Sequence, residues 1–268
     1  RDSARRRRVL AETLRVLQQA ETLRVLQLAR ANHARWADQA EPSPAQVDVQ
    51  IYAGDWGEVT LDLSRRYGQV FAVLNMANAY VPGGGYIEGA ASQEENLYRR
   101  SDCHFHIRDE DYDRETDRYR PHMTELISGV NGRVYLDTRQ PRVCIRGAED
   151  PGQPNLGYRW LDEDEIFSFF ELRSAAQDLR RGDLFDPDLA RRQVAAQLDT
   201  LIEAGVRHAV LGAFGCGAFR NPADQVAAIY RQEVDKRREA FSILAFAIRH
   251  MPYSASNLLP FQRAFAGA

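Results

Sequence analysis

The chain has 268 residues, of which 44% are hydrophobic and 10% aromatic. This is enough to bury one substantial core, and it fits one large globular domain better than two small ones. The formal net charge of −3 excludes a protein that coats nucleic acid through a basic surface. It does not exclude a phosphate ligand, because backbone N–H groups can hold one or two phosphates without basic side chains. Because of this charge, we expect no direct nucleic-acid binding. No apolar run reaches the roughly 18 residues of a membrane span, so we also expect no membrane partner.

The chain contains three cysteines, Cys103, Cys144 and Cys216. Their odd number and irregular spacing predict no disulfide framework and favour a reducing compartment, so we expect a cytoplasmic protein. The segment Cys103–His106 places its ligand-type side chains too close together for the usual metal-binding pairs, and no second pair follows. We therefore predict no metal site and no cofactor. Nothing in the sequence indicates oligomerisation, and a monomer is the expected state.

The N-terminal region predicts a helical extension. From Ser3 to about Trp36, apolar residues recur at the spacing of helices that pack on another surface. These residues are Val9, Leu10, Leu14, Leu17, Leu23, Leu26 and Ala29. The string AETLRVLQ occurs twice there with an offset of nine residues, or two and a half helical turns, which indicates a local duplication rather than a coiled-coil heptad. Residues 41–45 contain two prolines and indicate a linker, so we predict an extension at residues 1–45 packed on a domain at residues 46–268.

Strand signals follow the linker. Val47–Tyr52 and Gln69–Asn75 have the pattern of strands, and the second is apolar enough to be buried on both faces. Ser92 then stands before an acidic first turn and is a candidate N-cap for a helix. Residues 109–183 are charged and irregular, and their topology cannot be predicted. Strand candidates in this region are Gly132–Leu136, Arg142–Arg146 and Phe167–Leu172.

The last third repeats a strand, loop, helix and strand order. A helix is expected from Asp186-Pro187 to Gly205, followed by a strand at His208–Ala213. A glycine turn at residues 215–217 leads to a helix that starts at Asn221-Pro222, and Phe241–Ile248 predicts a further strand. This alternation predicts an α/β fold with a mostly parallel central sheet and ligand loops at the carboxyl ends of the strands. Both glycine turns follow strands directly, so we expect them to open onto the same edge.

The first glycine turn carries the clearest chemical signal. Residues 75–85, NMANAYVPGGG, place three glycines just beyond a buried strand, where the backbone can approach a ligand closely. A glycine triplet alone is as consistent with a flexible turn as with a ligand loop. Gln93-Glu94-Glu95 follows at the start of a helix, facing the same loop. Paired glutamates are also common in first turns because they interact favourably with the helix dipole, so this pair alone does not define a site.

Together these motifs resemble a known family. NMANAYVPGGG followed by YIEGAASQEE resembles the signature of the bacterial-type poly(ADP-ribose) glycohydrolases, a macrodomain-related group, with seven residues between the GGG and the QEE. LGAFGCGAFRNP, residues 211–222, resembles the family's second ligand loop. The resemblance runs loosely from about Val47 to the C-terminus, but not through residues 109–183. It implies a macrodomain-like three-layer α/β fold with a mixed, mostly parallel central sheet.

The resemblance also implies an activity and the residues that perform it. The activity would be hydrolysis of the ribose–ribose O-glycosidic bonds of poly(ADP-ribose), which releases ADP-ribose. Glu95 would be the general acid and base, and Glu94 would orient the ribose hydroxyls. Asn78 and Asn75 would contact the terminal ribose, and Phe219 would pack on the distal ribose. The other implied substrate-binding residues are Gly83, Gly84, Gly85, Gln93, Gly215, Cys216, Gly217 and Ala218.

Physical chemistry supports different tasks for the two glutamates. A glycosidic bond breaks through an oxocarbenium-like state that needs a proton on the leaving oxygen, and one well-placed acid supplies it. Adjacent helical residues point about 100° apart, so Glu94 and Glu95 cannot flank one bond as an opposed pair. A helix N-terminus lowers the pKa of an acid, whereas a neighbouring carboxylate and a substrate diphosphate raise it. We expect the anions to dominate once substrate is bound.

Two other functions use the same pocket. A macrodomain-like reader would bind ADP-ribose without cutting it, and a hydrolase of single ADP-ribose units on protein or nucleic acid would cut a different bond. The intact Gln93-Glu94-Glu95 favours an enzyme over a reader. A thiol nucleophile at Cys216 is disfavoured, because the sequence supplies no partner base. The expected partners are poly(ADP-ribose), ADP-ribose and poly-ADP-ribosylated proteins.

Overall fold

A computed structural model describes residues 1–249 and 256–268. The strands are β1 (Asp48–Ala53), β2 (Phe71–Met76), β3 (Tyr112–Asp113), β4 (Arg118–Tyr119), β5 (Tyr135–Cys144), β6 (Phe167–Ser174), β7 (His208–Leu211) and β8 (Ile243–Ile248). The α-helices are α1 (Asp2–Val16), α2 (Gln19–Asp38), α3 (Trp56–Tyr67), α4 (Gln93–Arg100), α5 (Pro121–Ser128), α6 (Pro187–Glu203), α7 (Ala223–Asp235) and α8 (Leu258–Ala264). Short 3₁₀ helices occur at Cys103–His106, Pro154–Leu156, Glu163–Glu165 and Arg238–Ala240.

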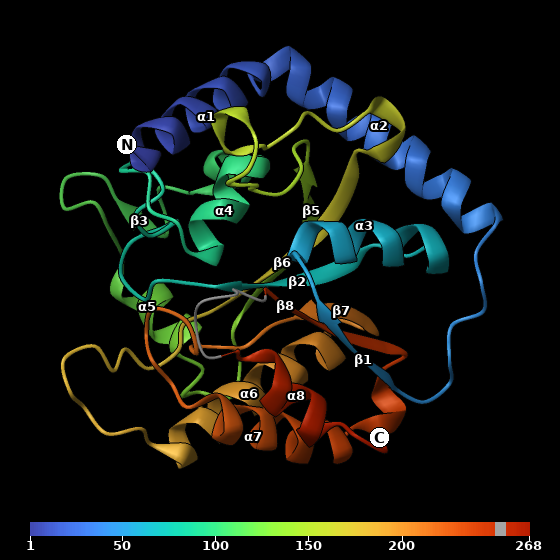
Figure 1. Ribbon diagram of the computed structural model, residues 1–268, viewed down its shortest axis with the longest axis vertical. Coiled ribbons are helices and arrows are strands. Elements are labelled where there is room, and N and C mark those ends of the chain that lie inside the picture. Colours follow the sequence, from blue (N-terminus) through green and yellow to red (C-terminus); the bar gives the residue numbers. More distant parts are fainter. Residues whose placement is uncertain (250–255) are drawn as a thin grey trace.

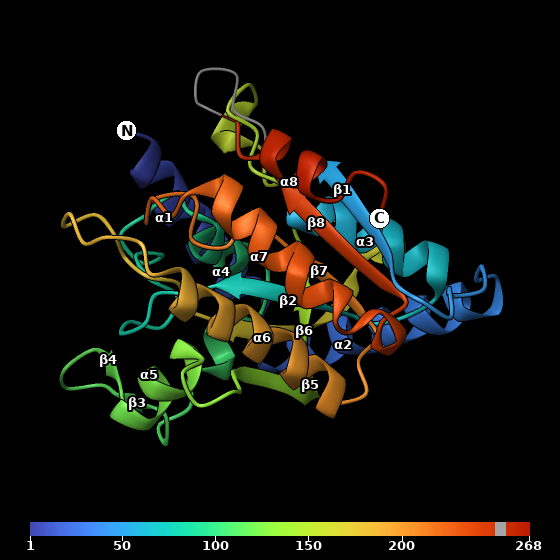
Figure 2. The same cartoon turned by 90° about the horizontal axis from the view of Figure 1, so that it is seen from below.

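Six strands form one central sheet in the order β1-β8-β7-β2-β6-β5. All neighbouring pairs in it are parallel except β5 and β6, which are antiparallel. Strands β3 and β4 form a separate two-stranded hairpin. Helices α1 to α4 lie on one side of the sheet and α6 to α8 on the other, as Figures 1 and 2 show. The predicted α/β fold with a mixed, mostly parallel sheet is confirmed.

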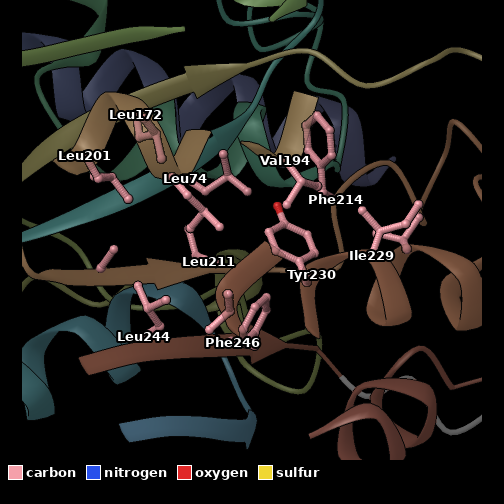
Figure 3. Close-up of a cluster of buried hydrophobic side chains, with 14 of the residues drawn as sticks. Leu74, Leu172, Val194, Leu201, Leu211, Phe214, Ile229, Tyr230, Leu244 and Phe246 are labelled. Carbon is pink, nitrogen blue, oxygen red and sulfur yellow. The ribbon is translucent and has the colours of Figure 1, made fainter. Parts of the chain in front are cut away.

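The central strand β2 shows why the sheet is covered on both faces. Its residues alternate between two apolar clusters, with Leu74 on the side of α6 and α7 and Val73 on the side of α3. In Figure 3, Leu74 and Leu211 pack toward Val194 of α6 and Tyr230 of α7. A strand with both faces buried reads as a continuous apolar run, which is the pattern from which β2 was predicted.

The N-terminal helices pack against the layer that contains α4. Thr13 of α1 is fully buried, and its hydroxyl donates to the backbone oxygen of Arg99 at 2.7 Å. Of the apolar residues expected to face the core, Leu23 is 65% exposed, so the prediction for this residue is wrong. The helix is interrupted between α1, which ends at Val16, and α2, which begins at Gln19. This interruption changes which residues of the second copy of the repeated string face the core. Helix periodicity alone does not reveal such a break.

The middle of the chain differs from the expected strands. Gly132–Leu136 and Arg142–Arg146 were predicted as separate strands, but the single strand β5 contains the end of the first candidate and the start of the second. Its pairing with β6 shifts between Asp137 and Arg142, where the Asp137 side chain accepts hydrogen bonds from two following backbone N–H groups.

Within the described ranges, no helix has the length and apolar character needed to cross a bilayer.

Candidate active site

Both glycine loops open at the same edge of the sheet, as expected. Strands β2 and β7 are parallel neighbours, so the loops that follow them emerge side by side. Between them lies a cavity of about 460 Å³. The predicted site residues that line it are Asn78, Gly85, Gln93, Glu94, Glu95, Gly215, Gly217, Ala218 and Phe219. The remaining lining residues are Met76, Ala77, Ala90, Ser92, Ala176, Arg180 and Ala213.

The Gln93 side chain fastens helix α4 to the end of strand β2. Its amide donates to the backbone oxygen of Leu74 at 2.8 Å and accepts from the backbone N–H of Met76 at 3.0 Å. Ser92 occupies the N-cap position but makes no side-chain capping hydrogen bond, contrary to the role expected for it. Gln93 therefore fixes where the helix begins, and with it the positions of the two glutamates that follow.

Glu94 is held inside the protein at the back of the cavity. Its Oε1 accepts from the backbone N–H of Asn78 at 2.8 Å, and its Oε2 accepts from Asn75 Nδ2 at 3.1 Å. Burial raises the pKa of Glu94 to about 8, and the negative charge of Glu95 adds to the increase, while the hydrogen bonds from Asn78 and Asn75 oppose it. Glu94 therefore holds its proton in the free protein at neutral pH.

This raised pKa predicts a pH-dependent stability. Between the usual pKa of 4.5 and about 8, the folded protein keeps a proton that the unfolded chain releases, so stability falls as pH rises. Each pH unit in this window removes at most about 1.4 kcal/mol. In thermal unfolding of wild type and Glu94→Gln from about pH 5 to pH 8, the Tm of the variant should rise relative to wild type with increasing pH. A difference in Tm that stays constant with pH would contradict this effect.

Glu95 lies against the first glycine loop. Its Oε1 accepts from the backbone N–H of Gly85 at 3.0 Å. Its Oε2 is buried and has no hydrogen-bond partner in the described part of the chain. A carboxyl oxygen without a protein partner at a cavity wall is available to a ligand, since unpaired buried polar atoms are otherwise costly.

Gly84 allows this close approach. Its φ is +57°, and a Cβ atom there would lie 2.5 Å from Glu95 Oε1 and 3.2 Å from Glu94 Oε1. Such a contact would displace the carboxylate on which the site depends.

If Glu95 has the predicted role of general acid, we expect Gly84→Ala to lower activity at least about tenfold, because small misplacements of a catalytic group are costly. It should also lower stability by about 1–2 kcal/mol through its positive φ. Gly132→Ala is the matched control, because Gly132 also has a positive φ, of +83°, but a Cβ there meets nothing within 4 Å. Equal activity of both variants in a polymer-hydrolysis assay would rule out the steric argument.

A buried charged network stands behind Glu94, and the sequence did not reveal it. Asn75 Nδ2, which donates to Glu94, also donates to Glu171 Oε2 at 2.9 Å. Glu171 is fully buried and forms ion pairs with Arg142 at 2.9 Å and Arg173 at 2.8 Å. These two guanidinium groups hold the pKa of Glu171 well below its usual value, against the effect of burial. Asn75 thus links a permanent negative charge to the carboxyl group of Glu94.

The second glycine loop presents free backbone donors. Within the described residues, no hydrogen bond is formed by the N–H groups of Gly215, Gly217, Ala218 and Phe219, all of which line the cavity. The Asn221 side chain holds the loop in shape by donating to the backbone oxygens of Gln177 at 2.7 Å and Gly215 at 3.0 Å. Unpaired backbone N–H groups in a loop that lines a cavity can bind an anion.

Four predicted site residues are not part of the cavity lining. Asn75 lies behind Glu94 and its side chain is fully buried. It contacts Glu94 and does not line the cavity in which a ligand would bind. Gly83 and Gly84 lie beneath the side chains of Tyr86 and Glu95. Cys216 packs toward the core, and burial raises the pKa of its thiol to about 12, which is unsuitable for a nucleophile.

The side chains of Cys103, His104 and His106 are buried or hydrogen-bonded to other residues of the protein. His104 Nδ1 is 2.8 Å from the hydroxyl of Tyr86, and His106 Nε2 is 3.1 Å from Asp102 Oδ2. Cys103 is buried, and burial raises the pKa of its thiol well above the usual value. The contact from His104 supports Tyr86, whose ring packs against Tyr98 of α4, with 4.8 Å between the ring centroids.

Comparison with known families identifies the segment that holds the two glutamates. Residues 7–127 match the family model described as the catalytic domain of microbial-type PARG, the poly(ADP-ribose) glycohydrolases. This segment is similar to that family. The resemblance seen in NMANAYVPGGG and the following QEE is confirmed, because both motifs fall within the match. No curated protein matches the chain.

Solved structures show the same fold over nearly the whole chain. Poly(ADP-ribose) glycohydrolase from Thermomonospora curvata has a TM-score of 0.67 and 23% identity, covering 97% of this chain and 99% of that one. The same enzyme bound to the inhibitor ADP-HPD has a TM-score of 0.62 at the same identity and coverage. Poly(ADP-ribose) glycohydrolase from Deinococcus radiodurans in complex with ADP-ribose has a TM-score of 0.60 and 21% identity, covering 91% of each chain. At these identities the comparison concerns the fold.

Proposed function

We propose that this chain is a poly(ADP-ribose) glycohydrolase, which hydrolyses ribose–ribose O-glycosidic bonds and releases ADP-ribose. One observation carries the proposal: Glu95, whose buried Oε2 has no hydrogen-bond partner among the described residues, lines the same cavity as the residues of the second glycine loop whose N–H groups are unpaired. An acid and an anion-binding loop in one cavity suit a substrate that combines a glycosidic bond with a diphosphate. The family match of residues 7–127 supports this reading.

Glu95 acts as the general acid. Protonated Glu95 donates its proton to the oxygen that leaves with the neighbouring ADP-ribose unit, while the bond between that oxygen and the anomeric carbon breaks. The sugar then carries oxocarbenium-like positive charge, and the substrate diphosphate held at the second loop stabilises it. Gly85 keeps the carboxyl group in place through its N–H.

Water completes the reaction. It attacks the anomeric carbon, and Glu95, now ionised, takes the proton from that water and returns to its starting state. Glu94 has a different task, because it is buried and hydrogen-bonded from Asn78 and Asn75. We assign it the orientation of the ribose hydroxyls, which requires a fixed hydrogen-bonding group rather than a mobile one.

A second hollow supports a ligand as long as ADP-ribose. It encloses about 180 Å³ and adjoins the main cavity, with which it shares Met76, Ser92 and Gln93. Its walls include Asp55 and Trp56, at the start of α3. A ligand with a ribose in the main cavity has room in this hollow for its nucleoside end. The Deinococcus radiodurans enzyme that shares the fold was solved with ADP-ribose, which agrees with this choice of ligand.

The proposal includes the organisation and surroundings of the enzyme. We assign residues 1–45 to a helical extension and residues 46–268 to the catalytic domain, with α1 supporting α4 through the contact between Thr13 and Arg99. The partners would be poly(ADP-ribose) and the proteins that carry it. Three free cysteines, two of them buried, favour a reducing compartment such as the cytoplasm.

Incubation of the purified protein with poly(ADP-ribose) tests the function. We expect free ADP-ribose to accumulate, measured by chromatography, under conditions in which ADP-ribose binding is demonstrable by calorimetry. Binding without turnover would identify a reader. Release of ADP-ribose from singly modified protein but not from the polymer would identify a mono-ADP-ribosyl hydrolase.

A further inference from the structure

A loop outside the two glycine motifs places an arginine side chain in the wall of the main cavity. Arg180 is the only cationic side chain among the described residues that line this cavity. It belongs to residues 177–186, whose ends are joined by two hydrogen bonds between the Gln177 side chain and the backbone of Asp186, at 2.8 and 2.9 Å. The backbone N–H of Leu179 also donates to the backbone oxygen of Phe219 at 3.0 Å. The Arg180 loop is therefore fixed to the second glycine loop.

The guanidinium group of Arg180 is held in a defined orientation. Asp178 accepts from its Nε at 2.8 Å and from its Nη2 at 2.6 Å. Its Cζ lies 5.0 Å from the centre of the Phe219 ring. Within the described part of the chain, Nη1 makes no hydrogen bond. A planar group fixed by a carboxylate and an aromatic ring has its remaining edge available at little entropic cost.

The charges of the other groups around the cavity favour a positively charged side chain at this position. Glu94 and Glu95 lie on one side, and only neutral N–H donors are offered by the second loop. A diphosphate carries two negative charges, so neutral donors alone leave charge uncompensated near two carboxyl groups. We propose that Arg180 is a phosphate-binding residue that selects ligands carrying a diphosphate. The identity of the ligand as ADP-ribose rests on the proposed function.

Calorimetric titration with ADP-ribose tests the role of Arg180 without relying on turnover. We expect Arg180→Ala to weaken ADP-ribose binding about five- to tenfold, since a charge-assisted hydrogen bond is lost from a half-exposed side chain. Arg180→Lys should lose less, because it keeps the charge. Arg181→Ala is the matched control: it removes an exposed arginine at the next position, which does not line the cavity, and should bind as wild type does. The salt dependence of binding should be weaker in Arg180→Ala than in wild type.

Equal affinities of Arg180→Ala and Arg181→Ala for ADP-ribose would overturn the proposal, as would an unchanged salt dependence. The titration tests the role of Arg180 separately from the polymer-hydrolysis assay, which tests the proposed function. If the wild type binds ADP-ribose but does not degrade the polymer, the enzyme activity fails and the assignment of Arg180 is still decided by the titration. Circular dichroism of each variant confirms that the comparison is made between folded proteins.

Discussion

Glu95→Gln should abolish ADP-ribose release while ADP-ribose still binds. The amide retains an oxygen that accepts from the N–H of Gly85, so the first glycine loop keeps its shape. It cannot donate a proton to the leaving oxygen or accept one from water. General acid–base catalysis contributes about 10²- to 10⁴-fold, and the rate of polymer hydrolysis should fall by at least the lower figure.

Glu88→Gln is the control for this substitution, because Glu88 is an exposed glutamate of the same loop and does not line the cavity. It should keep wild-type activity. Rates from a polymer-hydrolysis assay, together with Kd for ADP-ribose, separate chemistry from binding. Near-full activity of Glu95→Gln would show that the proton comes from another group.

Glu171→Gln should cause the largest loss of stability. Glu171 is fully buried and accepts from two guanidinium groups that are themselves almost fully buried, Arg142 and Arg173. The amide would leave Arg173 facing a neutral group, whereas Arg142 would keep its ion pair with Asp137 at 3.0 Å. Removing one partner from a buried ion pair costs about 3–5 kcal/mol, because the remaining charge stays uncompensated. For a chain of this size, Tm should fall by roughly 10 °C.

The matched control is Glu203→Gln, which removes an exposed ion pair with Arg133. An exposed pair contributes about 0–1 kcal/mol, so Tm should change little. Thermal unfolding at one pH compares the two variants. A small Tm change in Glu171→Gln, similar to that of the control, would mean that the buried cluster tolerates a neutral partner.

The sheet and the location of the site follow from patterns that are local in the sequence. The apolar run of β2 and the glycines that follow it place the first loop at the carboxyl edge of the sheet. Asp186 accepts from two backbone N–H groups of α6, as its position before Pro187 predicts. Neighbouring parallel strands then bring the second loop to the same edge. These features depend on residues close together in the chain.

The support behind the glutamates depends on contacts that no local pattern encodes. Arg142 reaches Glu171 only because β5 bends and pairs antiparallel with β6, a pairing that the sequence of residues 109–183 does not predict. Arg180 reaches the cavity because its loop is tied to the second glycine loop. The sequence also does not predict the burial of Glu94, which is the largest cause of its raised pKa. The expected effect of substrate on Glu95 stays a prediction.

A crystal structure of this chain soaked with ADP-ribose tests the central claim most directly. The quantity to measure is the distance from the Glu95 carboxyl group to the hydroxyl on the anomeric carbon of the terminal ribose. We predict a hydrogen-bond distance of about 2.6–3.2 Å, with the diphosphate on the N–H groups of the second glycine loop. A Glu95 side chain directed away from the ribose, or a nucleotide bound with the opposite end toward it, would contradict the account.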